Sequence, residues 1–138
     1  MAWRPLLCLP LVVVAAGCNA GGATTPPDQA QAAARAFVAD CARGQVLAAQ
    51  EILTDDARER FIAAGTGLEA CLRVLGVSPP AAAPPDRLRA LAAGLSVGEV
   101  KALRGEQFAT VALRGPAGPR PELEVERRGE LWRISTSP

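Results

Sequence analysis

The stretch Pro121-Glu122-Leu123-Glu124-Val125-Glu126-Arg127 decides the fold class of this chain, because its acidic and apolar residues alternate strictly. A period of two is typical of a β-strand that buries one face and leaves the other in water. The segment 131–136 repeats the pattern after a turn at Gly129-Glu130. We therefore predict an antiparallel hairpin with one buried face. The side chains expected to share that face are Leu123, Val125, Trp132 and Ile134.

Two further strands are expected just before this hairpin. The segments 97–103 and 107–114 alternate in the same way, and short turns at Gly105-Glu106 and at 115–120 separate the strands. Turns of this length connect neighbouring antiparallel strands. The C-terminal part of the chain is therefore predicted to be a four-stranded antiparallel meander. In its second strand, the expected inward residues are Ala109, Val111 and Leu113.

The residues before the strands show the period of an α-helix instead. Thr25 and Asp28 have the spacing of a capping box, and Gly44 has the position of a residue that ends a helix. Five helices are predicted, at 26–43, at 45–53, in a short stretch from 55, between Thr66 and Gly76, and at 87–93. The third is expected to turn Phe61 and Ile62 inward, and Asp86 is expected to cap the last. Helices followed by a meander predict an α+β fold with the helices on one face of a curved sheet.

Cys41 and Cys71 each lie in the apolar stripe of a predicted helix. In an exported chain such a pair predicts a disulfide. A bridge that closes a loop of about 30 residues stabilises a fold by roughly 3–4 kcal/mol in the chain-entropy model. The alternative is two buried free thiols. The chain has no His, so the pair lacks the further ligands of a zinc site, and we expect no metal.

The residues Val14-Ala15-Ala16-Gly17-Cys18 follow Arg4 and a short apolar run, which is the order of a secretory signal. They resemble the lipobox of bacterial lipoproteins, in which the cysteine thiol receives a diacylglycerol. The resemblance implies a signal peptide at 1–17, a lipidated Cys18 and a flexible tether at 18–25 that holds the protein at the extracytoplasmic face of the cell membrane. Two alternatives remain: a signal peptide cut near 20–23, and an uncleaved anchor, although about 12 apolar residues fall short of the roughly 20 that span a bilayer.

The composition narrows the chemistry of the protein. With 15 basic and 14 acidic residues the chain is nearly neutral, whereas nucleic-acid binders carry a clustered basic excess, so we expect no nucleic-acid partner. The chain has neither His nor Tyr. The commonest general base and the usual phenolic oxyanion donor are therefore both missing. No motif for a cofactor is present, and we expect none.

Several stretches along 28–136 carry a family resemblance. They are Arg35-Ala36-Phe37-Val38, Cys41-Ala42-Arg43-Gly44, Ile52-Leu53-Thr54-Asp55-Asp56-Ala57-Arg58, Phe108-Ala109-Thr110-Val111 and Gly129-Glu130-Leu131-Trp132-Arg133-Ile134. Their succession resembles the small NTF2-like (cystatin-like cone) lipoproteins of actinobacteria. The resemblance implies that 26–138 form one NTF2-like domain, in which helices pack in the concavity of a strongly curved sheet and often leave a pocket.

Two sets of residues are candidates for a site. An apolar cavity is expected to be lined by Phe37, Phe61, Leu72 and Phe108. Enzymes with this fold place an Asp in the pocket, and Asp40, beside the apolar stripe of the first helix, is the candidate base. The competing interpretation of Asp40 is a charge at the helix edge, paired with Arg43 or Arg35.

The glutamates of the stretch 121–127 form an acidic row on the outer face of the predicted sheet. They either pair across strands with Arg114 and Arg104 or form a face that binds a partner. Two functions therefore remain open. The favoured one is a membrane-tethered, non-catalytic envelope lipoprotein that binds a small apolar ligand or a protein partner. Its rival is an NTF2-like enzyme, of the isomerase or dehydratase type, that works through a lone carboxylate.

Overall fold

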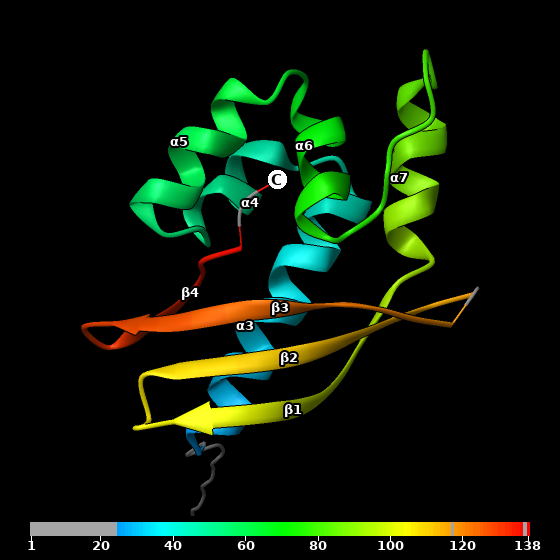
Figure 1. Cartoon of the computed structure of the whole chain (residues 1–138). Coiled ribbons are helices and arrows are strands. Elements are labelled where there is room, and N and C mark those ends of the chain that lie inside the picture. Colours follow the sequence, from blue (N-terminus) through cyan, green and yellow to red (C-terminus); the bar gives the residue numbers. More distant parts are fainter. Residues whose placement is uncertain (1–24, 117, 137) are drawn as a thin grey trace, which may run out of the picture.

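The helices of this protein precede its strands along the chain, as the periodicities predict. The structure is a computed structural model that describes residues 25–116, 118–136 and 138. Its helices are α3 (Pro26–Ala42), α4 (Val46–Glu51), α5 (Asp55–Ala63), α6 (Gly67–Val74) and α7 (Pro85–Ala93). Its strands are β1 (Ser96–Arg104), β2 (Phe108–Gly115), β3 (Gly118–Arg128) and β4 (Leu131–Ile134). The α+β class is confirmed (Figure 1).

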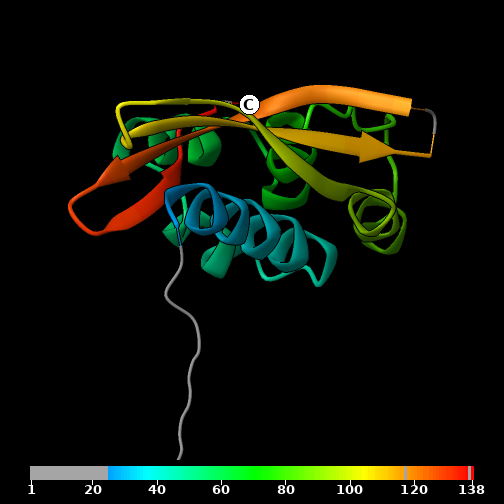
Figure 2. The same cartoon turned by 90° about the horizontal axis from the view of Figure 1, so that it is seen from below.

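The strands form one antiparallel sheet in the order β1-β2-β3-β4, which is the predicted meander. Helix α3 lies against one face of this sheet (Figure 2). The shorter helices gather around the C-terminal end of α3, beyond β3 and β4 (Figure 1). No described helix covers the opposite face of the sheet in either view. We call this uncovered side the outer face.

The register of β3 and β4 confirms the predicted inner face. Val125 is paired with Ile134, and both are at most 1% exposed. Trp132 is buried as well, and its indole Nε1 donates a hydrogen bond to Oε1 of Gln29 at 3.0 Å. The inner face therefore consists of the four residues expected from the alternation, which are Leu123, Val125, Trp132 and Ile134.

Helix α3 is the centre of the core and contacts all four strands. At its start, Oγ1 of Thr25 accepts a hydrogen bond from the Asp28 amide at 3.4 Å. At its end, Gly44 adopts a φ of 74°, which is the left-handed conformation that favours glycine. The cap at Thr25 and the end of the helix at Gly44 agree with the prediction, and Thr25 supplies one half of the predicted capping box. The small side chains of its buried face allow α3 to lie close to the sheet, and that face contains Ala30, Ala34, Phe37, Val38 and Cys41.

Helix α4 is shorter than predicted, because residues 52 and 53 do not continue it and the segment 52–54 pairs with the last strand instead. The Ile134 amide donates to the carbonyl of Ile52 at 2.7 Å, and the Thr54 amide donates to the carbonyl of Ile134 at 2.9 Å. This parallel bridge covers the edge of β4 at Ile134, its last residue. Helix α4 therefore ends at Glu51.

Two other local predictions are wrong. Ile62 is 60% exposed, because the buried face of α5 consists of Ala57 and Phe61, and the next residue is turned about 100° away from it. Asp86 does not cap α7. Pro84 occupies the cap position, and Asp86 instead lies within the first turn, where its charge favours the helix dipole.

The predicted disulfide is present. Cys41 of α3 and Cys71 of α6 are bonded, with their Cα atoms 5.8 Å apart. Both residues are at most 1% exposed. The bridge thus joins the central helix to one of the short helices inside the core.

Candidate functional site

Three of the four apolar residues predicted to line a cavity lie in the hydrophobic core. Phe37, Phe61 and Leu72 are each at most 1% exposed and belong to one buried cluster. Phe108 is 43% exposed and lies on the outer face of the sheet. The structure therefore brings the first three together as core packing and separates Phe108 from them.

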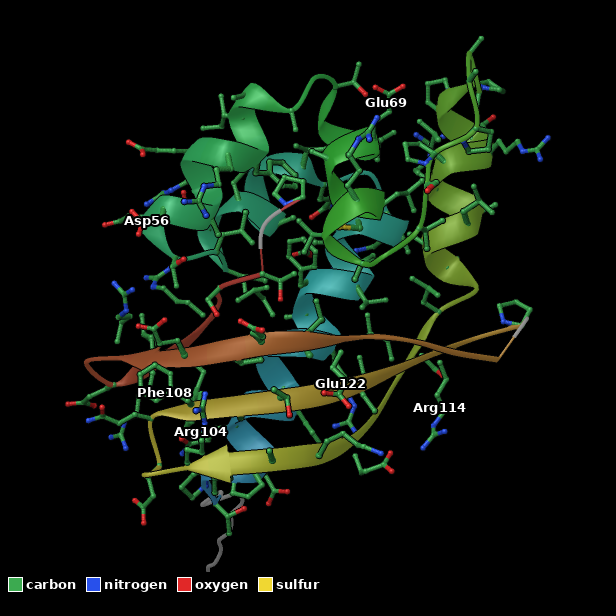
Figure 3. The ribbon with its side chains drawn as sticks, in the orientation of Figure 1. Asp56, Glu69, Arg104, Phe108, Arg114 and Glu122 are labelled. Carbon is green, nitrogen blue, oxygen red and sulfur yellow. A yellow bond between two sulfur atoms is a disulfide. The ribbon has the colours of Figure 1, made fainter. Side chains whose placement is uncertain are left out.

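Phe108 lies directly after a tight hairpin turn, and the turn determines its neighbour. Gly105 and Glu106 adopt φ values of 59° and 58°, as a type I′ turn requires. The Gln107 amide closes the turn by donating to the carbonyl of Arg104 at 3.1 Å. Arg104 is then paired with Phe108 across the strands, and its guanidinium lies 5.8 Å from the ring centre (Figure 3). This is the geometry of a cation–π contact.

A hollow of about 320 Å³ opens around this pair on the outer face. Arg104 supplies a positive charge to its lining, and Glu124 and Glu126 of β3 supply negative charges. Glu126, which is paired in register with Phe108, binds Arg128 with its Oε1 2.5 Å from the Nε. The hollow thus combines an aromatic ring with charges of both signs, and we call it the Phe108 hollow.

The acidic row of β3 does not form the cross-strand ion pairs that one interpretation predicts. Arg104 lies over Phe108, and Arg114 binds Glu99 of β1 instead. Glu122 and Glu124 are exposed and form no ion pair with a side chain that the structure describes. Two carboxylates of the row are thus without an ionic partner among the described side chains, and Figure 3 shows Glu122 on the outer face.

Arg114 reaches Glu99 because β1 has a glycine between them. The Arg114 Nη2 lies 2.6 Å from Glu99 Oε1. A Cβ atom at Gly98 would stand 3.0 Å from the Arg114 Nε and 3.3 Å from the Cβ of Ala112. A hydrogen bond from its own backbone amide and, next, the Arg114 guanidinium lower the pKa of Glu99 below 4.5. Gly98 therefore leaves the space through which Arg114 crosses β1.

Asp40 lies near the C-terminal end of α3, mostly buried, with a guanidinium beside it. Its Oδ1 is 2.9 Å from the Nη2 of Arg43, one helical turn further on. This pairing corresponds to the interpretation of Asp40 as a charge at the helix edge. Asp40 does not line the Phe108 hollow.

No known protein family, curated protein or solved structure matches this chain.

The membrane-related predictions concern residues outside the described part of the chain. The signal peptide at 1–17, Cys18 and the tether up to residue 24 all lie there. Within residues 25–116, 118–136 and 138, no helix is both long and apolar enough to cross a membrane. In the same residues, no group of three His, Cys, Asp or Glu side chains is arranged to hold a metal ion.

The contact between Arg104 and Phe108 was not predicted from the sequence, because it depends on the register of β1 and β2. A two-residue turn at Gly105-Glu106 pairs Arg104 with Gln107 in an ideal hairpin. The observed pairing has one extra residue on the second strand, which brings Phe108 opposite Arg104 instead. A signal for the outward position of Phe108 was available, because an inward Ala109 requires its neighbour to point outward.

Proposed function

We propose that this protein is a lipid-anchored, extracytoplasmic lipoprotein with an NTF2-like domain that binds a protein partner and does not catalyse a reaction. The lipobox at 14–18 supports the anchor, and the order of helices and strands supports the fold family. The observation that carries the binding role is the uncovered outer face of the sheet, where the Phe108 hollow lies beside the turn between β1 and β2.

The composition of the outer face supports a protein partner. Aromatic residues and Arg are enriched in protein interfaces, and Phe108 and Arg104 form such a pair on the surface. Glu124 lies in the same hollow without an ionic partner among the described side chains. A partner surface with a Lys or Arg side chain opposite Glu124 and an apolar side chain against Phe108 complements it in both charge and polarity.

The positions of the predicted cavity residues favour a surface partner over a small ligand held in the interior. Phe37, Phe61 and Leu72 all belong to the buried cluster of the core. Residues used in this way supply fold stability. The enzymatic alternative loses support from the ion pair between Asp40 and Arg43, because a carboxylate that abstracts a proton must be free to reach a substrate.

The test is site-specific photo-crosslinking on the full lipoprotein in its native membrane. A photoreactive phenylalanine analogue replaces Thr110, which lines the Phe108 hollow. The matched control carries the analogue at Ile62, which is 60% exposed on α5. We expect a discrete cross-linked species from position 110 that is absent from position 62.

Two variants connect the cross-link to the proposed contacts. Phe108→Ala and Glu124→Lys are each expected to reduce the yield from position 110 at least fivefold without changing the amount of protein in the membrane. An unchanged yield in both variants, or equal cross-linking from positions 110 and 62, contradicts the proposal.

A further inference from the structure

A second candidate surface lies on the opposite side of the molecule from the Phe108 hollow, along α3. A groove of about 470 Å³ runs between α3 and the segment that leads from α7 into β1. We propose that this groove binds a single fatty-acid chain, with the carboxylate at Arg35. The proposal concerns a different surface from the proposed function and is independent of it.

The helical period builds one wall of the groove from α3. Positions 35, 39 and 42 follow one another at spacings of four and three residues, and position 43 lies four residues after 39, so they share one face of the helix. The side chains of Ala39 and Ala42 consist of a Cβ atom alone. They therefore leave a depression between Arg35 and Arg43. The residues of this wall that line the groove are Arg35, Val38, Ala39, Ala42 and Arg43.

Apart from Ser96, the residues of the floor and the opposite wall of the groove are apolar. Val38 and Leu95 lie at its base and are each 7% exposed. Ala93 and Val97 line the side formed by the end of α7 and the start of β1. An acyl chain placed between these walls removes apolar surface of both partners from water, which is the driving force for binding.

The charges at the rim select a ligand with one negative charge. Arg43 is already paired with Asp40 at 2.9 Å. Arg35 is exposed and forms no ion pair with any side chain in the described ranges. One guanidinium is thus left unmatched, and its planar fork fits a carboxylate through two parallel hydrogen bonds.

The size of the groove favours a single chain over a protein helix. Arg35 and Arg43 are eight residues apart, which corresponds to about 12 Å along the helix axis. A stable protein interface buries at least about 1,000 Å² in total, and a groove of two helical turns with small residues offers much less. An extended acyl chain needs only a narrow apolar track that begins at a cation.

The test is photoaffinity labelling of the full lipoprotein in nanodiscs of zwitterionic phospholipid. The probe is a palmitate with a diazirine on its chain, and peptide mapping by mass spectrometry locates the label. We expect labelled peptides from 35–43 or 93–97, and at least a fivefold loss of label when excess unlabelled palmitate competes. Competition by lysophosphatidylglycerol but not by palmitate contradicts the proposed head group.

Three variants test the groove itself. Ala39→Trp fills the depression and is expected to reduce labelling at least tenfold, whereas Arg35→Gln removes the head-group contact and is expected to reduce it three- to tenfold. Arg73→Gln changes an exposed arginine of α6 outside the groove and is expected to leave labelling unchanged. Melting temperatures check that each variant is folded, and Ala42→Leu replaces Ala39→Trp if the latter is not. Labelling that is spread over all peptides, or that survives filling of the groove, overturns the proposal.

Discussion

At the scale of single residues, the same residue type has different roles on the two sides of the sheet. Phe61 is 1% exposed in the core, and Phe108 is 43% exposed on the outer face. Truncation of a core Phe removes its transfer free energy and leaves a cavity. Truncation of an exposed ring removes little apolar burial.

These two phenylalanines therefore form a matched pair for a stability measurement. We expect Phe61→Ala to lower the free energy of unfolding by about 3–5 kcal/mol, and Phe108→Ala to lower it by less than about 1 kcal/mol, which includes the loss of the contact with Arg104. Urea denaturation followed by circular dichroism measures both. Equal losses in the two variants contradict the assignment of Phe108 to the outer face.

The pair of Glu99 and Arg114 gives a pH-dependent prediction. The pKa of Glu99 is lowered in the folded protein, so its small contribution to stability is present above pH 4.5 and is lost as the pH falls through the lowered pKa. A valine at position 98 displaces the Arg114 side chain, since even a Cβ there stands 3.0 Å from the Arg114 Nε. We expect Gly98→Val to raise the pKa of Glu99 toward 4.5.

An NMR titration of the Glu99 side-chain carbon measures this pKa. Ala102→Val, which changes β1 further along the strand, is the control and is expected to leave the value lowered. The hydrogen bond from the Glu99 backbone amide remains in Gly98→Val, so its pKa is expected to rise only part of the way to 4.5. A Glu99 pKa in Gly98→Val that is as low as in the parent contradicts the role of Gly98 in admitting Arg114.

At the scale of elements, the disulfide determines how α6 is held against α3. The bridge closes a loop between residues 30 positions apart. We expect the double variant Cys41→Ala/Cys71→Ala to lose about 3–4 kcal/mol of unfolding free energy by the chain-entropy argument. Denaturation of the parent with and without a reductant is the control, because reductant destabilises the parent and leaves the double variant unchanged. Equal stability of parent and double variant refutes the expected contribution.

The two edges of the sheet are protected by different means. Residues 52–54 pair with the end of β4 through the bridge to Ile134. Strand β1 carries two register irregularities, and the Gln31 side-chain amide donates to the carbonyl of Gly98 at 2.8 Å. Irregular pairing and a capped carbonyl both discourage pairing of the edge with another chain. These features support placing the proposed partner on the outer face rather than at an edge.

At the scale of the whole molecule, the proposed anchor at Cys18 predicts where the protein is found. We expect intact-mass analysis of the membrane fraction to give a chain that begins at Cys18 and carries a diacylglycerol. Cys18→Ala removes the thiol that accepts the diacylglycerol. We expect this variant to be released from the membrane or to keep an unprocessed N-terminus. A water-soluble mature chain that begins after residue 18 contradicts the anchor.

The sequence by itself determined the class and order of the elements, because these depend on local regularities. The alternation through Leu123 and Val125 specifies a strand with one buried face, and any fold that buries apolar side chains must respect it. The cap at Thr25 and the left-handed glycine at position 44 satisfy backbone groups within one turn of the helix. The pairing of Cys41 with Cys71 was also predictable, since both lie on apolar helix faces. Of the four cysteines in the chain, the other two, Cys8 and Cys18, belong to the predicted signal peptide and lipidation site.

Only the tertiary structure decided the partners of the surface side chains and the shape of the surface. Residue 53 continues a helix by periodicity, but its backbone joins β4 because that edge offers unpaired groups. Arg114 binds Glu99 rather than the acidic row because Gly98 leaves space beside β1. Phe108 contacts Arg104 because one extra residue after the turn changes the register of the two strands. Such contacts depend on long-range pairing that differs by a single residue, and local patterns contain no information about that difference.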